Sequence, residues 1–238
     1  YYVNDAGRQI DILSASVIMK MYESDNHFFP QNAYKGKYIE DLGKKILEKD
    51  NFNLIIDKSI LDNLSKDPET EIDEIISYLK NHCQEGWETV KDFSLKSIIK
   101  DIKNDLRSFN VEFNNWFYES SLGSLDDSKS EISVAINRLE ENKQAYKKDG
   151  AIWLNTEDSG DDKHRVLVRD DGRATYFASD VAYHKNKIDR GFDEIINIWG
   201  ADHHGYIKRI ESSIEGLCSK KEKLIVKLVQ FANLYKDG

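Results

Sequence analysis

Apolar positions along the chain alternate between the spacing of strands and that of helices. The opening residues Tyr1–Val3 read as a strand, and Ile10, Leu13, Val17 and Met21 recur at helical spacing behind the polar turn 4–7. A strand, a turn and a helix in this order form half of a parallel α/β unit. A loop over 24–38 and a short helix through Leu42 are expected next.

The middle of the chain predicts an inserted pair of helices. Apolar stripes run through 72–79 and through 95–106. Alternating Phe109, Val111 and Phe113 then predict a strand that runs through Tyr118 into a turn at 119–121. A further helix is expected over 128–146.

From Gly150 onward the pattern changes to short strands, at 151–154 and 165–169. They are followed by a predicted helix over 179–188, a buried strand over 195–199, a turn at 200–205, a helix to Leu217 and a strand within 224–231. Strands that alternate with helices predict an α/β fold, a doubly wound parallel sheet with one helical and one small β-rich insertion.

This pattern divides the chain into five parts. They are a first part of the sheet domain (1–58), a helical insertion (59–108), a strand of the sheet domain (109–122), a connective insertion with short strands (123–174) and the second half of the sheet domain (175–238).

Composition restricts the class of protein. The chain has 238 residues, 39% of them hydrophobic and 32% charged, as in a folded soluble protein. A net charge of -9 argues against a general nucleic-acid coat, although a local basic face is compatible with it. Cys83 and Cys218 lie far apart without metal-ligand spacing, which predicts reduced thiols in the cytoplasm. No membrane-spanning run is present, and the ends, Tyr1 and Gly238, indicate a piece of a longer protein.

Ligands of open parallel sheets bind where strands end, so the residues that follow the strands are the candidates. Asn4 follows the first strand and offers both a donor and an acceptor; a helix N-cap is the structural alternative. Tyr176 and Asp180 would share one helix face, and a phenol beside a carboxylate suits a planar cation such as guanidinium. The alternative there is a cap at Ser179 or Asp180, with Tyr176 in the core.

The third candidate site is the segment 199–205, after the most hydrophobic strand. Gly200 permits close backbone approach, and Asp202 can accept hydrogen bonds from ribose hydroxyls. His203 and His204 are adjacent and lack a third ligand, so no metal site is predicted and a turn with surface histidines is the alternative. The loop 158–163 lacks the final Glu of a calcium loop and is expected to be a solvated turn.

Three segments carry a family resemblance. YYVNDAGRQID (1–11), GAIWLNTEDSGDDKHRVLVRDDGRATYFASDVAYH (150–184) and RGFDEIINIWGADHHGYIKR (190–209) closely resemble bacterial arginyl-tRNA synthetases, and VEFNNWFYESSL (111–122) fits as well. The resemblance implies the Rossmann-type catalytic domain of the class I synthetases. It also implies ATP-dependent ligation of L-arginine to tRNA(Arg) through arginyl-adenylate, with ATP and its Mg²⁺.

The resemblance also implies roles for single residues. Asn4 would hold the amino group or carboxylate of the substrate, Tyr176 and Asp180 would read the guanidinium, and Gly200, Asp202 and His203 would touch ribose and the aminoacyl group. No catalytic residue is assigned, because the HIGH-like and KMSK-like signatures are missing; they would lie before Tyr1 and after Gly238, so this chain alone is expected to be nearly inactive. A cytoplasmic monomer without DNA or membrane partners is expected.

Two alternatives stay open. The first is another class I synthetase or nucleotidyl transferase that shares the sheet. The second is a catalytically silent fragment that binds nucleotide or arginine.

Overall fold

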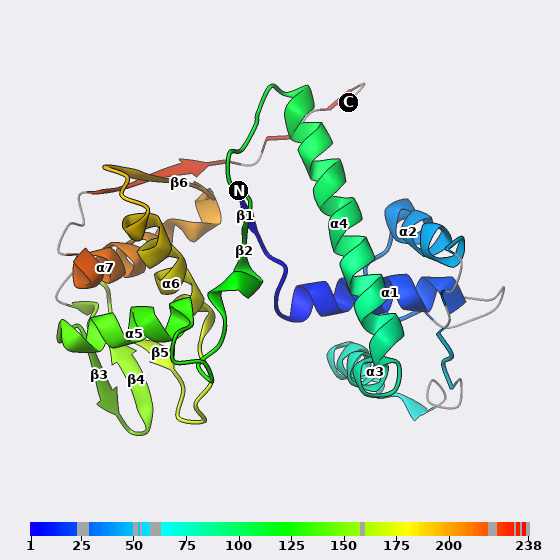
Figure 1. Cartoon of the computed structure of the whole chain (residues 1–238), viewed down its shortest axis with the longest axis horizontal. Helices are drawn as coiled ribbons and strands as arrows, with labels where there is room; N and C mark the ends of the chain where they lie inside the picture. Colours follow the sequence, from blue (N-terminus) through cyan, green and yellow to red (C-terminus); the bar gives the residue numbers. More distant parts are fainter. Residues whose placement is uncertain are drawn as a thin grey trace. The chain divides into compact units, whose positions relative to one another are not determined.

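The computed structural model shows two compact units, Tyr1–Glu119 (unit 1) and Ser120–Gly238 (unit 2) (Figure 1). The residues that the structure describes are 1–22, 29–49, 52, 54–57, 63–157, 160–218, 223–230, 232–233 and 235–236.

Unit 1 contains a short parallel strand pair. β1 (Tyr2–Val3) pairs with β2 (Phe117–Tyr118), and Tyr2 lies opposite Phe117. The terminal ammonium of Tyr1 donates to the carbonyl oxygen of Asn115 at 2.8 Å. Segments more than 100 residues apart thus lie side by side, as the predicted parallel α/β arrangement requires.

Four helices form the rest of unit 1. They are α1 (Arg8–Tyr22), α2 (Lys37–Leu47), α3 (Pro68–His82) and α4 (Gln84–Ser108). All four lie where the apolar spacing predicts helices. The start of α3 has a clear local cause, because the side chain of Asp67 accepts a hydrogen bond from the backbone N–H of Thr70 and Pro68 occupies the first turn.

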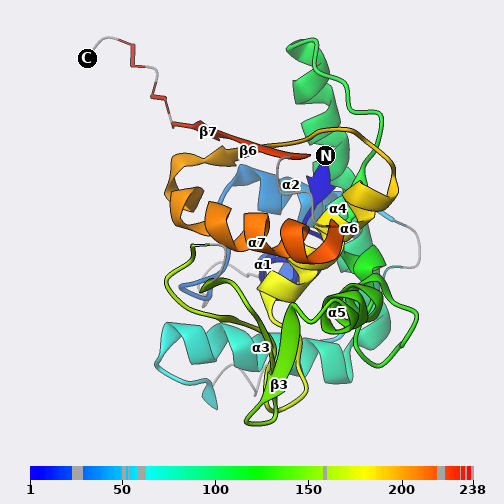
Figure 2. The ribbon, with the colours of Figure 1, turned by 90° about the vertical axis from the view of Figure 1, so that its left-hand side faces the viewer.

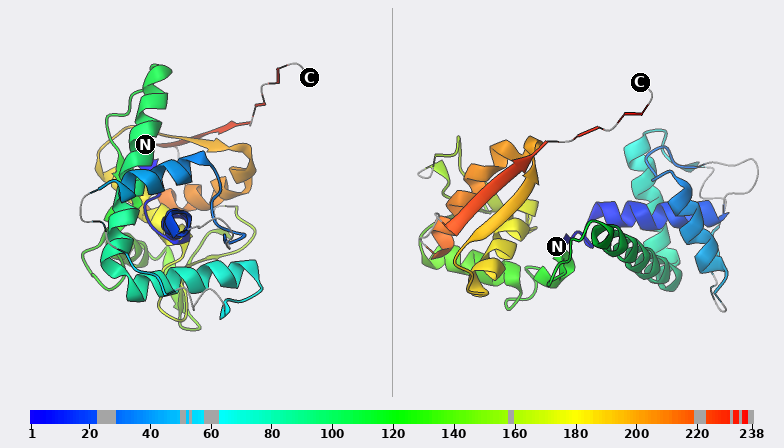
Figure 3. Two further views of the ribbon diagram at one scale, coloured as in Figure 1. Left: turned by 90° about the vertical axis from the view of Figure 1, so that its right-hand side faces the viewer. Right: turned by 90° about the horizontal axis from the view of Figure 1, so that it is seen from above.

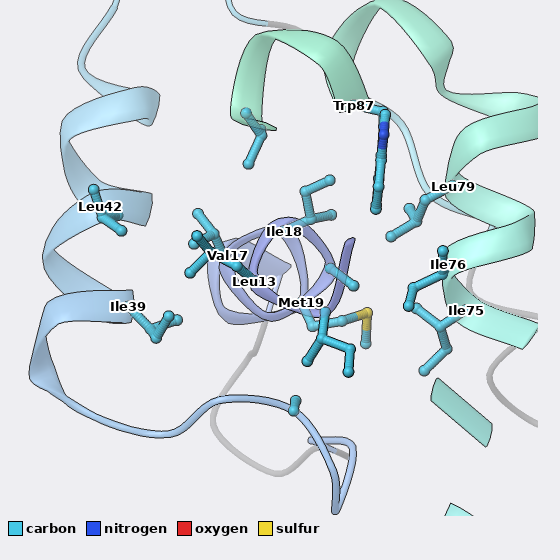
Figure 4. Packing of buried hydrophobic residues seen from close by; sticks show 14 of the residues in the cluster. Leu13, Val17, Ile18, Met19, Ile39, Leu42, Ile75, Ile76, Leu79 and Trp87 are labelled. Carbon is cyan, nitrogen blue, oxygen red and sulfur yellow. The ribbon is translucent and has the colours of Figure 1, made fainter. Parts of the chain in front are cut away.

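The core of unit 1 surrounds α1. Figure 4 shows α1 end-on, with side chains of α2, α3 and α4 directed toward it. The fully buried residues at its centre include Val17, Ile18, Ile46, Leu79 and Trp87. The predicted helical insertion therefore shares one hydrophobic core with the first helices of the chain, while the five-part domain division stays a prediction.

The strand predicted from Phe109 to Tyr118 is wrong over most of its length, because only Phe117 and Tyr118 form a strand. Phe109 is 80% exposed, and Asn110 has a φ of 56°, which takes the backbone out of the extended conformation. Phe113 packs instead against Tyr1 with ring centroids 5.4 Å apart. The apolar alternation over 109–113 is therefore not that of a strand.

The first half of unit 2 is a helix followed by a three-stranded antiparallel sheet. Its elements are the 3₁₀ helix η2 (Glu119–Leu122), which begins in unit 1, and α5 (Glu131–Glu141), β3 (Ala145–Lys148), β4 (Ala151–Leu154) and β5 (Arg165–Val168). The sheet order is β3-β4-β5. The predicted helix 128–146 ends early, and β3 was not predicted. Lys143 has a φ of 59°, which stops the helix and turns the chain into β3.

The second half of unit 2 is a parallel strand pair covered by helices. Its elements are α6 (Tyr176–Asp189), β6 (Ile195–Gly200), the 3₁₀ helix η4 (Ala201–Tyr206), α7 (Ile207–Cys218) and β7 (Leu224–Val229). β6 and β7 pair in parallel from Ile195 opposite Leu224 to Gly200 opposite Val229. Figures 2 and 3 show the two strands side by side, with α6 and α7 on one face.

β6 is not a fully buried strand, contrary to the sequence prediction. Ile195 and Asn197 are buried, whereas Ile196 is 57% and Ile198 is 69% exposed within the described chain. Alternate side chains of a strand point to opposite faces, and the helices of unit 2 cover one face of the pair. The α/β class and its parallel pairing are confirmed; whether the two pairs belong to one sheet stays a prediction.

Two further expectations concern thiols and membranes. Cys83 and Cys218 are free cysteines. Within the part of the chain that the structure describes, no helix combines the length and the apolar character that crossing a membrane requires.

Candidate functional site

The end of β1 brings an amide and a carboxylate together. With its amide nitrogen facing the acceptors, Asn4 donates to the carbonyl oxygen of Ala6 at 3.0 Å and to Oε2 of Glu119 at 2.7 Å. Glu119 directly follows β2, so the carboxyl ends of both parallel strands contribute a polar side chain. The pair offers hydrogen-bond donors and acceptors to a small polar ligand.

A hollow of about 450 Å³ opens beside these strand ends in unit 1. Tyr118 of β2 and Asp5, two residues after β1, line it on one side. The side chains that line it from α4 include Asp92, Lys96, Lys100 and Lys103. Lys103 also lies 4.6 Å from the centre of the Trp116 ring. The charges around the hollow are therefore mixed and do not select an anionic ligand.

In unit 2, the predicted site residues Tyr176 and Asp180 lie in the first turns of α6. Thr175 is the N-cap, because its side chain accepts from the backbone N–H of Ala178. The alternative reading is therefore wrong on both counts, since neither Ser179 nor Asp180 caps the helix and Tyr176 is 74% exposed. Tyr176 and Asp180 lie one helical turn apart, as predicted.

The turn after β6 carries the third group of predicted residues. A side chain at Gly200 would meet Oδ1 of Asp202, which is exposed and can move aside, and the φ of Gly200 is an ordinary -62°, so the backbone of this turn does not require glycine. Asp202 and His203 are both exposed, with 3.6 Å between Oδ2 of Asp202 and Nε2 of His203. An electrostatic attraction from His203 lowers the pKa of the Asp180 carboxyl, which indicates that this turn lies near Asp180. That Gly200, Asp202, His203 and Asp180 bind one ligand stays a prediction.

Tyr206, at the end of η4, contacts Asp180 directly. Its hydroxyl donates to Oδ2 of Asp180 at 2.6 Å. Burial is the main influence on Asp180 and raises the pKa of its carboxyl, while the Tyr206 hydrogen bond, Lys187 and His203 oppose that rise. Burial and the neighbouring Asp180 in turn raise the pKa of the Tyr206 phenol well above its ordinary range. The arrangement is a half-buried carboxylate that a cation would stabilise.

A buried polar network lies beneath Asp180. The backbone oxygen of Asp180 accepts from Nδ1 of His184 at 2.7 Å, and Nε2 of His184 accepts from the amide of Asn197 at 2.8 Å. The amide oxygen of Asn197 accepts from the ammonium of Lys187 at 2.7 Å. Burial lowers the pKa of Lys187 to about 8 and that of His184 to about 3. The network ties the site-bearing turn of α6 to β6.

His184 makes the stability of the fold depend on pH. Its pKa in the folded protein, about 3, lies below the ordinary value of 6.5, so the unfolded chain takes up the proton first. The contribution of His184 to the free energy of unfolding is expected to be complete above about pH 6.5 and to fall by about 1.4 kcal/mol per pH unit below it. Urea titrations at about pH 7 and about pH 5 measure this slope.

A matched pair of variants tests that assignment. His184→Gln should flatten the slope between the two pH values, whereas His204→Gln, at an exposed histidine, should keep it. An unchanged slope in His184→Gln would remove His184 as its source.

The comparisons place the sequence among known proteins. No family model matches the chain. An arginine–tRNA ligase of Vesicomyosocius okutanii is 47% identical over the whole chain, and one of Legionella pneumophila is 42% identical. The chain spans 42% and 41% of their respective lengths. Along its entire length, this chain is homologous to a segment of arginyl-tRNA synthetases.

Solved structures agree with this similarity. A Campylobacter jejuni protein assigned as an arginyl-tRNA synthetase is 35% identical, with a TM-score of 0.76 over 100% of this chain and 46% of the other. Arginyl-tRNA synthetase from Thermus thermophilus is 15% identical, with a TM-score of 0.63 over 96% of this chain and 41% of the other, and supports the fold alone. The expected class I synthetase fold is confirmed.

The sequence did not point to four polar residues of the two candidate sites. They are Glu119, Lys187, Asn197 and Tyr206. Asn197 is the one with a visible signal, since it is a lone amide inside the apolar run Ile195–Trp199. The others come from different elements, so no spacing in the sequence reveals their contacts.

The acidic loop before β5 is exposed at Gly160, Asp162 and Lys163, as a solvated turn would be, and only Asp161 departs from the prediction. Asp158 and Ser159 lie outside the described residues. The side chain of Asp161 is only 6% exposed, and Arg165 donates to both of its carboxylate oxygens, at 2.6 and 2.7 Å. Among the described residues, no group of three His, Cys, Asp or Glu side chains is placed to hold a metal ion. The Asp161–Arg165 pair is structural.

Proposed function

We propose that this chain takes part in the ATP-dependent attachment of L-arginine to tRNA(Arg) through arginyl-adenylate. The observation that carries the proposal is the half-buried Asp180 carboxylate, held by the Tyr206 hydroxyl at the turn after β6. A carboxylate accepts two parallel hydrogen bonds from a guanidinium, and partial exclusion of water strengthens that attraction. Burial disfavours the charged form of Asp180 and so raises its pKa, and the positive charge of a bound arginine would stabilise that charged form.

Other candidate residues of both units have matching roles in this proposal. Tyr176, four residues before Asp180, is exposed and offers its ring to the flat guanidinium. Gly200 and Asp202 bind the ribose of ATP, and His203 lies beside the aminoacyl group. Asn4, with Glu119 hydrogen-bonded to it, binds the amino group or carboxylate of the substrate.

The substrates follow from the same proposal. ATP would carry Mg²⁺ on its phosphates, where the metal would supply positive charge that offsets theirs. Binding and orientation of arginine and ribose are the contributions of this chain. We propose a cytoplasmic monomer with tRNA(Arg) as its nucleic-acid partner.

Pyrophosphate exchange tests the proposed reaction. In the enzyme that contains this sequence, arginine should drive ATP–pyrophosphate exchange in the presence of tRNA, whereas lysine and citrulline should not. Lysine lacks the planar fork and citrulline lacks the charge that Asp180 would pair with. Exchange driven equally by another amino acid would favour a different class I synthetase.

Calorimetry on the 238-residue chain tests the alternative that this chain binds arginine or nucleotide but is catalytically silent. Arginine binding without turnover is expected, because the sequence contains neither the HIGH-like nor the KMSK-like signature. Absence of arginine binding, with the chain folded, would argue against the assigned site.

A further inference from the structure

Tyr206 contacts Asp180 directly but is not among the residues proposed above to bind arginine or ATP. Its hydroxyl donates to Oδ2 of Asp180 at 2.6 Å, and both side chains are half-buried. A phenol that donates to one carboxylate oxygen restricts rotation of the whole carboxylate about its last bond.

The Tyr206 ring is itself held by three other elements. The ring of Phe177 on α6 lies 6.0 Å away in an edge-on arrangement, and that of Trp199 on β6 lies 6.1 Å away. The guanidinium carbon of Arg209 on α7 lies 5.2 Å from the ring centre. Aromatic and cation–π contacts of this kind fix the ring before any ligand arrives. The hydroxyl is thus aimed at Asp180 by packing around it.

The orientation of the carboxylate plane affects the binding of a guanidinium more than that of an ammonium. A guanidinium forms two parallel hydrogen bonds to a carboxylate only when the two groups are nearly coplanar. An ammonium is a compact charge with rotatable donors, so it pairs with a carboxylate in almost any orientation. A contact that fixes the carboxylate plane therefore favours binding of arginine over binding of lysine.

We propose that Tyr206 is a positioning residue that fixes the plane of the Asp180 carboxylate and thereby selects a guanidinium over an ammonium. The inference rests on the proposed function, in which Asp180 binds the arginine side chain. It adds a specificity determinant that does not itself touch the substrate.

The charges around Asp180 predict a second consequence. Lys187 faces Asp180 from the same helix, His203 and Tyr206 face it from η4, and Arg209 on α7 faces Tyr206. The Tyr206 hydrogen bond lowers the pKa of Asp180 against the effect of burial. Its removal should raise that pKa, so arginine binding, which needs the ionised carboxylate, should fail at a higher pH.

Tyr206→Phe separates the hydroxyl from the ring. The ring contacts to Phe177, Trp199 and Arg209 remain, and only the hydrogen bond is lost. In the enzyme that contains this sequence, the KM for arginine should rise about 10-fold and kcat should change less than about 3-fold. The ratio of kcat/KM for arginine over lysine should fall about 10-fold. The acid limb of the arginine kcat/KM profile should move to higher pH.

Tyr146→Phe is the matched control, because it removes a hydroxyl from β3 of the same unit, away from Asp180. It should change none of these values. If Tyr206→Phe unfolds, Phe177→Leu provides a second test, since it loosens the Tyr206 ring while keeping the hydroxyl, and it should lower the selectivity in the same direction.

Two results distinguish this inference from the proposed function. Folded Tyr206→Phe with unchanged KM, selectivity and acid limb would overturn the role of Tyr206 even if Asp180 proves essential. An unmodified enzyme that does not discriminate arginine from lysine would instead overturn the proposed function itself.

Discussion

Replacement of Asp180 by alanine is expected to lower kcat/KM for arginine by about 100-fold or more. The substitution removes the half-buried anion that the guanidinium would pair with and leaves the arriving cation partly desolvated without a partner. Loss of one member of a buried, hydrogen-bonded charge pair costs about 2–5 kcal/mol, which corresponds to factors from about 30 to several thousand. Steady-state kinetics with varied arginine at saturating ATP and tRNA measure the effect.

The Asp180→Ala variant should stay folded, so the loss of kcat/KM can be attributed to the missing carboxylate. The carboxylate of Asp180 has a raised pKa because burial disfavours its charge, so its removal from the free protein should be tolerated. Asp180→Asn keeps the shape of the side chain and should lose nearly as much activity, because an amide nitrogen repels a guanidinium. Asp193→Asn, at an exposed carboxyl before β6, is the control and should behave as the unmodified enzyme does. Full activity in Asp180→Asn would remove Asp180 from guanidinium recognition.

Asn197→Ala is expected to destabilise the fold by about 3 kcal/mol. Asn197 is 3% exposed, and its amide satisfies Nε2 of His184 and the Lys187 ammonium together. Alanine leaves both partners unpaired beneath β6, and a buried polar group without a partner costs about 1–3 kcal/mol, more when it is charged. Urea-induced unfolding at about pH 7, followed by circular dichroism, measures the loss.

Asn142→Ala provides the comparison for this prediction. The Asn142 side chain donates to the carbonyl oxygen of Gly216 at 2.8 Å, and it is exposed, so water can replace the lost bond. A cost of about 1 kcal/mol is expected there. A cost of about 1 kcal/mol or less for Asn197→Ala would show that the network beneath Asp180 stabilises the fold no more than one exposed hydrogen bond does.

The helices of unit 1 could be predicted because their apolar residues repeat at helical spacing. Ile72, Ile75, Ile76 and Leu79 lie on one face of α3, and all four are buried. α6 also starts close to its predicted position, with Thr175 as a cap that the spacing alone does not identify. Periodicity predicts such elements because burial of one helix face is what stabilises them.

The strands were harder to predict, since strand pairing depends on residues far away in sequence. Phe109, Val111 and Phe113 alternate as a strand would, yet no partner strand lies beside them within the described chain. β3 was missed because its four residues, Ala145–Lys148, end in two lysines and become a strand only by pairing with β4.

The sequence by itself determined the α/β class, the positions of the main helices and the likeness to arginyl-tRNA synthetases, and it singled out Asp180 as a candidate carboxylate. These conclusions depend on local periodicity and on motifs, which are properties of neighbouring residues. Only the tertiary structure placed Tyr206 against Asp180 and joined His184, Asn197 and Lys187 beneath it. Those contacts connect α6, β6 and η4, and packing between elements that are separate in sequence decides them.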